Sequence, residues 1–94
     1  MLRLKSKGKF ELQYQDLVLR NPEIEVIVLQ KVKWFLNNPN DTRLDNHPLK
    51  KRMKGKFAFS ITDDIRIVYE WVGKSTAHLM AIGTHKKVYF KKLI

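Results

Sequence analysis

The spacing of hydrophobic residues changes near Gly55, and this change constrains the fold more than any other feature of the chain. Before it, apolar side chains recur three or four positions apart, and after it they occupy every second position. The first spacing places them on one face of a helix, and the second places them on one face of a strand. Helices followed by strands predict an α+β domain with the helices packed on one face of a sheet.

Two helices are expected before the change of period. The first begins at about Gly8 and carries four apolar side chains on one face: Phe10, Tyr14, Leu17 and Val18. Asn21-Pro22-Glu23 is typical of a helix start, with Asn21 as N-cap and Pro22 at the first helical position. The second helix runs to about Asn37 along a second apolar stripe: Ile24, Ile27, Val28, Val32 and Phe35. Its β-branched residues would also suit a strand, but the start signal and the length favour a helix.

The strands are expected at the two ends of the chain. Leu2–Leu4 predicts a short first strand, and residues 38–46 read as a polar loop that His47-Pro48 closes. Three alternating runs then predict a meander: residues 57–62, 65–72 and 77–82. Tight turns at Asp63-Asp64 and Gly73-Lys74-Ser75 connect these strands. The expected sheet is small, twisted and antiparallel, made of the short first strand and the C-terminal meander.

The 94 residues are expected to form one domain, 1–94, because chains of this length fold around a single small core. No apolar run approaches the roughly 18 residues that a membrane span requires, and residues 1–10 lack the apolar centre of a signal peptide. The chain has no cysteine, which excludes disulfides and thiolate metal sites. A cytoplasmic protein is therefore predicted.

The charge of the chain indicates a polyanionic partner. Nineteen Lys and Arg residues against nine Asp and Glu give a formal net charge of +10, which favours nucleic acid, an acidic protein or an anionic membrane surface as partner. The bases cluster at residues 50–56, with five bases in seven residues, and again at Lys86, Lys87, Lys91 and Lys92. The first cluster lies at a strand entrance rather than on an amphipathic helix, which favours nucleic acid over a membrane. A merely solvated basic surface is the alternative.

Neither a metal site nor a phosphate-binding loop is expected. His47, His78 and His85 lack the HxH or HExxH spacing of metal ligands, and their surroundings are cationic. Gly73-Lys74-Ser75 matches only the end of a P-loop, because Val68 stands where that motif needs glycine and a strand follows. No cofactor is predicted. His78 lies mid-strand among apolar residues and is interpreted as a half-buried structural histidine.

Four polar residues suit the cleavage of a phosphodiester: His47, Asp64, Arg66 and His85. Each lies at an element boundary or on the polar face of a strand, near a basic cluster. Attack by an RNA 2′-hydroxyl needs a base, an acid for the leaving oxygen and cations for the phosphorane charge. Histidine can make either proton transfer near neutral pH. The alternatives are an exposed surface role for His85 and a turn role for Asp64.

The C-terminal half of the chain resembles the RelE/ParE toxin superfamily, and within it the YafQ-type ribosome-dependent mRNA interferases most closely. The resemblance rests on His47-Pro48-Leu49, then Lys54-Gly55, then the "DIRIVY" strand, then "IGTH" with an aromatic residue four positions later. These motifs span about half of the chain, and the helical first half fits the family layout. The resemblance implies a helix pair against a twisted antiparallel sheet. It also implies cleavage of mRNA in the ribosomal A site and neutralisation by a co-expressed antitoxin.

The resemblance also assigns roles to single residues. His47 matches the histidine before Pro-Leu, Asp64 the acid that opens the central strand, and His85 the histidine of the Gly-Thr-His turn, where Gly83 is expected to turn the chain. Arg66 matches the strand arginine of the RelE-like branch, which contacts the scissile phosphate. Tyr89 matches the aromatic residue that stacks on a base. We expect His85 and Asp64 to share the proton transfers with help from His47, and Arg66 and Lys54 to stabilise charge.

The expected function is therefore a metal-independent endoribonuclease toxin that inhibits translation. Its expected partners are mRNA, ribosomal RNA and an acidic antitoxin. The RNA is expected to contact Tyr89 and six bases: Lys50, Lys51, Arg52, Lys54, Lys86 and Lys87. The chain departs from the YafQ-type pattern at Ser60, Ile65 and Ala81, where that pattern has histidine, tryptophan and arginine. Two alternatives stay open: a ParE-like inhibitor of gyrase, and a catalytically weakened RNA-binding protein of the same fold.

Overall fold

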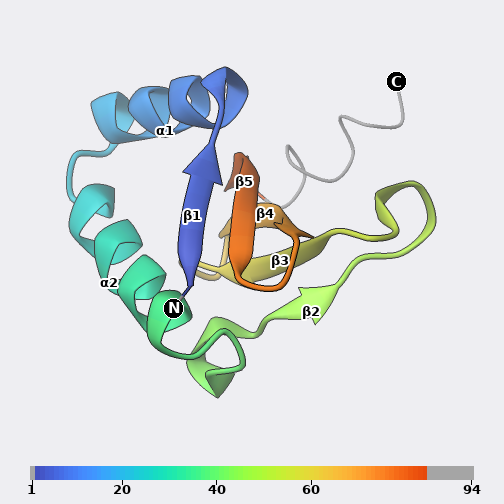
Figure 1. Cartoon of the computed structure of the whole chain (residues 1–94). Helices are drawn as coiled ribbons and strands as arrows, with labels where there is room; N and C mark the ends of the chain where they lie inside the picture. Colours follow the sequence, from blue (N-terminus) through green and yellow to red (C-terminus); the bar gives the residue numbers. More distant parts are fainter. Residues whose placement is uncertain (1, 85–94) are drawn as a thin grey trace.

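The structure, a computed structural model, describes residues 2–84 of the chain. Two helices and five strands alternate with two short 3₁₀ turns: β1 (Arg3–Ser6), α1 (Gly8–Arg20), α2 (Ile24–Asn37), η1 (Thr42–Leu44), β2 (His47–Pro48), η2 (Lys51–Met53), β3 (Phe57–Ser60), β4 (Ile65–Val72) and β5 (Thr76–Thr84). The helices lie together on one side of the sheet (Figure 1). The α+β class, the two helices and the C-terminal meander are thus confirmed.

The sheet is mixed rather than antiparallel, and this corrects the expectation from the sequence. Its strand order is β1-β5-β4-β3-β2, and the pairs from β5 to β2 are antiparallel. β1 instead runs parallel to β5, with Arg3 opposite Thr76 and Ser6 opposite Leu79. A parallel pair needs a long crossover connection, which the helices and the meander provide here.

The strands also differ from the prediction in number and in bounds, with β1 at Arg3–Ser6 rather than Leu2–Leu4 and β3 ending at Ser60 rather than at residue 62. β2 is an additional edge strand of two residues, in which His47 pairs with Ala58 and Pro48 pairs with Phe57. An edge strand tolerates proline because one side of it needs no backbone donor. β5 continues past residue 82 to Thr84, so Gly83 makes no turn and instead pairs with Arg66.

The start of α2 is the third correction. The helix begins at Ile24, and the preceding residue, Glu23, makes no side-chain capping bond. Asn21 instead ends the preceding helix as the C-cap of α1, and its backbone amide donates to the Leu17 carbonyl oxygen at 3.0 Å. The segment Asn21-Pro22-Glu23 is therefore a turn that precedes the helix. Among residues 2–84, no helix is long and apolar enough to cross a membrane.

The alternating pattern of the meander separates two faces of the sheet. On the face toward the helices, Ile67 and Tyr69 of β4 are buried against residues such as Phe35 of α2. On the opposite face, hereafter the open face, Ala58, Val68 and Ala81 form a second small cluster. A β-bulge between Val68 and Tyr69 shifts the register with β5 but preserves this division. The predicted apolar stripes of both helices are confirmed as core or core-packing residues.

Candidate functional site

Three strands bring Ser60, Arg66 and Gly83 into one row across the open face. Ser60 pairs with Arg66, and Arg66 pairs with Gly83. Glycine has no Cβ, so Gly83, which is buried, adds no side chain to the row beside the arginine. The row lies at the end of the sheet where β3 turns into β4, and Asp64 belongs to that turn. The structure therefore brings two of the predicted site residues, Asp64 and Arg66, to the same end of the sheet.

Thr62 organises the turn that carries Asp64. Its hydroxyl accepts from the backbone amides of Asp64 at 3.3 Å and Ile65 at 3.0 Å, a common turn arrangement for threonine. Arg66 Nη1 donates to the Thr62 carbonyl oxygen at 2.7 Å and more weakly to that of Ile65 at 3.4 Å. These bonds hold the half-buried guanidinium against the turn, close in sequence to Asp64.

Arg66 forms no ion pair with any carboxylate of residues 2–84. A guanidinium anchored by carbonyl oxygens keeps its full charge, because carbonyls do not neutralise it. It is therefore suited to bind an anion such as a phosphate.

The described part of β5 ends at Thr84, next to the Asp64 turn. Thr84, the last described residue, pairs with Ile65 beside Asp64. The predictions for His85, Lys86, Lys87 and Tyr89 lie outside the described residues.

His47 lies apart from the Asp64 turn. It sits on the edge strand opposite Ala58, two residues and hence about 7 Å along β3 from Ser60. Its Nδ1 donates to the Asp45 carbonyl oxygen at 2.8 Å, and Asp45 adopts a left-handed conformation with φ of 50°. Because a carbonyl only accepts, the neutral ring carries its hydrogen on Nδ1 and leaves Nε2 as an acceptor. Sequence spacing grouped His47 with Asp64, but the structure separates the two.

The basic cluster projects from the segment between β2 and β3. Lys50, Lys51, Arg52 and Lys54 are all exposed and form no ion pair within the described part of the chain. Leu49 and Met53 alternate with them and pack on the small cluster of the open face. The apolar residues thus anchor the segment, and the four predicted RNA-binding cations point toward solvent beside that face.

His78 has the structural role that the sequence indicated. It is half-buried on β5, and its Nδ1 lies 3.6 Å from Glu70 Oε2. The other carboxylate oxygen of Glu70 lies 4.0 Å from Lys56 Nζ. Glu70 thus neutralises Lys56, which separates this base from the four unpaired ones nearby. No group of three or more potential metal ligands occurs among residues 2–84.

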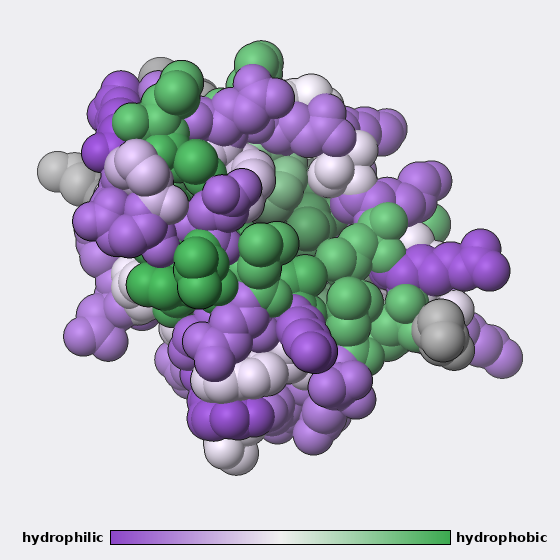
Figure 2. Space-filling view, turned by 90° about the vertical axis from the view of Figure 1, so that its left-hand side faces the viewer, coloured by the Kyte–Doolittle hydropathy of each residue, from purple (hydrophilic) through white to green (hydrophobic). Residues whose placement is uncertain are grey.

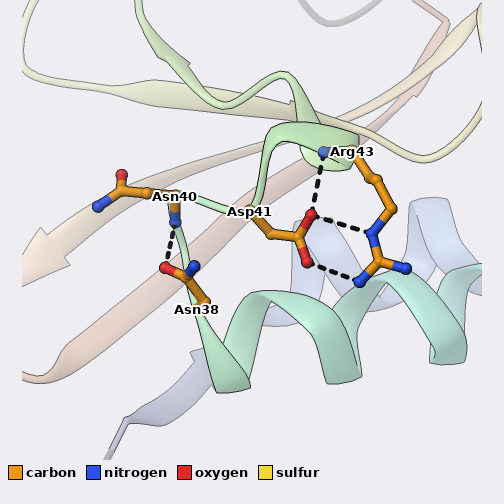
Figure 3. Close-up of polar contacts among 4 residues, drawn as sticks. All are labelled: Asn38, Asn40, Asp41 and Arg43. Carbon is orange, nitrogen blue, oxygen red and sulfur yellow. Dashed lines mark hydrogen bonds and ion pairs between the residues drawn. The ribbon is translucent and has the colours of Figure 1, made fainter.

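A polar loop holds the strand that carries His47. Asp41 accepts from the backbone amide, Nε and Nη2 of Arg43 at 3.0, 3.0 and 2.8 Å (Figure 3). These bonds lower the pKa of Asp41 to about 2. The Arg43 guanidinium also lies 3.6 Å from the ring centre of Trp34. The loop is thereby attached to α2.

Sequence reasoning missed a pocket beside His47. It has a volume of about 300 Å³, and its lining includes six side chains: Asn40, Asn46, His47, Phe57, Tyr69 and Trp71. These residues come from segments far apart in the chain, so no local motif could reveal the pocket. The alternation of β4 did indicate that Tyr69 and Trp71 share a face.

The helical side of the molecule has a different character. Figure 2, which views that side, shows apolar side chains gathered between polar ones. The most exposed large apolar residues there are Leu12, Leu19, Val26 and Leu29, between 60% and 81% exposed. Residues 8–37 contain four Lys or Arg and four Asp or Glu, so this surface has no net charge.

The fold is similar to that of several solved toxin structures. YafQ from Escherichia coli is 16% identical with a TM-score of 0.78, over 95% of this chain and 99% of that one. A copper-bound mutant toxin from Helicobacter pylori is 26% identical with a TM-score of 0.74, over 95% and 100%. A YoeB/ParE toxin from Agrobacterium tumefaciens is 18% identical with a TM-score of 0.77, over 89% and 99%. No family model and no curated protein sequence matches the chain.

These likenesses cover nearly the whole chain and agree with the motifs of its C-terminal half. The helix pair and the five-stranded mixed sheet are thus the RelE/ParE-like toxin fold, in a form near that of YafQ.

Proposed function

We propose that this chain is the toxin of a type II toxin–antitoxin pair and that it cleaves mRNA on the ribosome. The observation that carries the proposal is Arg66, a half-buried arginine without an ion-pair partner among residues 2–84, anchored at the turn that also carries Asp64. Four unpaired cations stand on the neighbouring segment between β2 and β3. The likeness to solved toxins supports the toxin role.

The proposed reaction is a transesterification within the RNA strand. A base removes the proton of a ribose 2′-hydroxyl, and the oxygen attacks the adjacent phosphorus. The bond from phosphorus to the 5′-oxygen of the next nucleotide breaks, and an acid gives that oxygen a proton. The products are a 2′,3′-cyclic phosphate and a free 5′-hydroxyl, with no metal and no cofactor required.

His85 and Asp64 are proposed to share the two proton transfers. His47 assists at the edge of the site, where its Nε2 is available to accept a proton. The arginine fork of Arg66 matches the oxygens of a phosphate, and its charge, with that of Lys54, opposes the charge that develops on the phosphorane. Tyr89 is proposed to stack on a base.

Ser60 alters this site relative to the YafQ-type pattern. It stands next to Arg66 in the row across the open face, where that pattern has a second histidine. A serine hydroxyl can donate a hydrogen bond to a phosphate but does not titrate near neutral pH. The proposed enzyme therefore relies on fewer acid–base groups, and a slower reaction than that of a two-histidine site is expected.

An antitoxin is the proposed protein partner, as the likeness to toxins of toxin–antitoxin pairs implies. We propose that it is acidic, because unpaired cations attract an oppositely charged partner. The ribosome and mRNA are the proposed targets, which places the activity in the cytoplasm.

The deciding experiment is to induce the gene and map the 5′ ends of cellular mRNA. Cleavage within translated codons that disappears when ribosomes are removed is the expected result. As a control, Lys33→Ala changes an exposed cation of α2, and it should cleave like the unmodified chain. If gyrase supercoiling stops before translation and no new mRNA ends appear, the gyrase-inhibitor alternative replaces the proposal.

A further inference from the structure

The pocket beside His47 lies at the end of the sheet opposite the Asp64 turn. Phe57 begins β3, whereas Ser60 ends it, and Phe57 pairs with Tyr69. Phe57, Tyr69 and Trp71 belong to the face of the sheet toward the helices. The proposed cleavage uses Arg66 on the open face, so apart from His47 it leaves this pocket unexplained.

Three aromatic rings form one wall of the pocket. Phe57 and Tyr69 stack, with ring centres 5.6 Å apart and planes at 24°, and Tyr69 meets Trp71 edge to face at 5.5 Å. Tyr69 is buried, whereas Phe57 and Trp71 are half-buried and line the hollow. Phe57 and Trp71 are therefore the two partly exposed rings of the wall that a bound flat ring can contact.

Asn46 adds a fixed polar group to the wall. Its Nδ2 donates to the Pro39 carbonyl oxygen at 2.8 Å and to the Tyr69 hydroxyl at 2.7 Å. Because a carbonyl only accepts, these bonds fix the orientation of the amide. Its Oδ1 is buried without a hydrogen-bond partner in the described residues. The polar group that Asn46 contributes to the wall is therefore held rigidly against Tyr69.

The loop that closes the pocket is braced before any ligand binds. The Asp41–Arg43 pair and the contact of Arg43 with Trp34 attach it to α2. Asn40 uses its backbone amide to bond Asn38 Oδ1 at 3.0 Å, and its exposed side chain points away from the Asp41–Arg43 pair (Figure 3). A wall that is already ordered loses little entropy when a ligand enters.

We propose that this pocket binds one unpaired base of an RNA strand. Its volume, about 300 Å³, is at the small end for ligand sites and suits a single base. Stacking on aromatic rings and hydrogen bonding to base edges are the means by which proteins hold unpaired RNA bases. The inference rests on the proposed function, because it takes RNA as the ligand.

The pocket lining is uncharged, whereas the segment that follows Pro48 is basic, so the two regions suit different parts of an RNA strand. The lining has no Lys, Arg, Asp or Glu, so it suits the uncharged base rather than a phosphate. Lys50 and Lys51 follow Pro48, which borders the pocket, by two and three positions. In the proposal, the RNA backbone follows the basic segment beside the open face, and one base reaches around the β2 edge of the sheet into the pocket.

Fluorescence of Trp71 tests the proposal without any cleavage. The variant Trp34→Phe leaves Trp71 as the sole tryptophan and keeps an aromatic ring beside Arg43, while the Asp41–Arg43 pair that braces the loop is unchanged. It is titrated with a short single-stranded RNA, with the same RNA carrying abasic sites, and with adenosine 5′-monophosphate. The expected result is a change of Trp71 emission with the intact RNA, at an affinity at least about fivefold above that for abasic RNA. The mononucleotide should bind more weakly than the RNA.

Three variants separate the contribution of the pocket from that of the basic segment. In the Trp34→Phe background, Asn40→Ala changes an exposed side chain and Phe57→Leu removes a ring, and both should reduce the preference for intact over abasic RNA. Lys51→Gln should instead weaken both RNAs by the same factor. Circular dichroism verifies that each variant folds.

Equal affinity for intact and abasic RNA would overturn the proposal, as would mononucleotide binding as tight as that of the RNA. The two proposals can fail separately. If the induced chain cleaves no mRNA in cells but Trp71 emission still responds to intact RNA in the titration, the proposed reaction is refuted and the pocket assignment stands.

Discussion

The helical side of the molecule and the segment between β2 and β3 carry opposite kinds of surface. Residues 8–37 balance four bases with four acids and expose Leu19 and Val26 at 81% and 72%. Residues 47–56 contain five bases and no acid, and only Lys56 among them meets a carboxylate in the described structure. Residues 47–56 thus supply five of the ten net positive charges of the chain, whereas residues 8–37 supply none.

The largest expected difference is in the rate of mRNA cleavage, between variants of the proposed catalytic residues and a variant on the helical side. His85→Ala should reduce mRNA cleavage by roughly 10²–10⁴-fold, the usual contribution of one general acid or base. Arg66→Ala should reduce both RNA binding and cleavage, because it removes the anchored phosphate-binding fork. Cleavage rates on translating ribosomes measure both effects, with Lys33→Ala on α2 as the matched control. Toxicity of His85→Ala equal to that of the unmodified chain, at equal expression, would remove the histidine from the mechanism.

The second-largest difference between the two surfaces is expected in the salt dependence of RNA binding. Changing Lys50, Lys51, Arg52 and Lys54 to Gln should flatten the slope of log affinity against log salt by up to about 3, since each phosphate contact on a single strand contributes about 0.7. The same change at Lys31 and Lys33 on α2 should leave the slope unaltered. Fluorescence anisotropy with a labelled single-stranded RNA at several salt concentrations gives both slopes. If the two sets of changes flatten the slope equally, the charge does not act locally.

The Asp41–Arg43 pair, in the loop between α2 and β2, should make the stability of the fold depend on pH. Arg43 lowers the pKa of Asp41 from 3.8 to about 2 in the folded chain. A depressed carboxyl pKa stabilises the fold above the unfolded value, and this contribution is lost as the pH falls from about 4 to about 2. Urea unfolding across this range should show the loss, and Asp41→Asn should remove this part of the pH dependence. An unchanged profile in the variant would show that the pair does not brace the loop.

The smallest effect is expected at the exposed apolar residues of the helices. Leu19→Ser and Val26→Ser should each change the free energy of unfolding by no more than about 0.5 kcal/mol, because these side chains bury little surface in the isolated chain. Thermal unfolding measures this. A much larger loss would mean that the helical side is covered in the isolated protein, for instance by a second copy.

The change of period near Gly55 was sufficient to predict the helices, the meander and the division of β4 into two faces. That division placed Arg66 on the polar side, and the structure adds that Ser60 and Gly83 share its row. The two residues of β2 are too few to have a period, and the pairing partner of β1 depends on residues at the far end of the chain. Neither feature could be predicted from local pattern.

The candidate site shows the same limit. Asp64 and Arg66 are two positions apart in one turn and strand, so their proximity follows from the sequence. His47 reaches the sheet by way of a loop whose path is set by Asp41, Arg43 and Trp34, and this path separates His47 from the turn. The aromatic pocket likewise depends on how residues 39–48 fold over residues 57–71.

The parallel pairing of β1 with β5 also governs when the molecule can be completed during its synthesis. β1 precedes both helices and the other four strands, yet its only neighbour in the sheet of the described residues is β5, the last strand of that sheet in chain order. Contacts between such distant segments form late, because the loop between them must close first. The sheet therefore stays unfinished until Thr76–Leu79 have left the ribosome. A protein proposed to act on ribosomes thus cannot complete its own sheet before residues 76–79 have emerged from one.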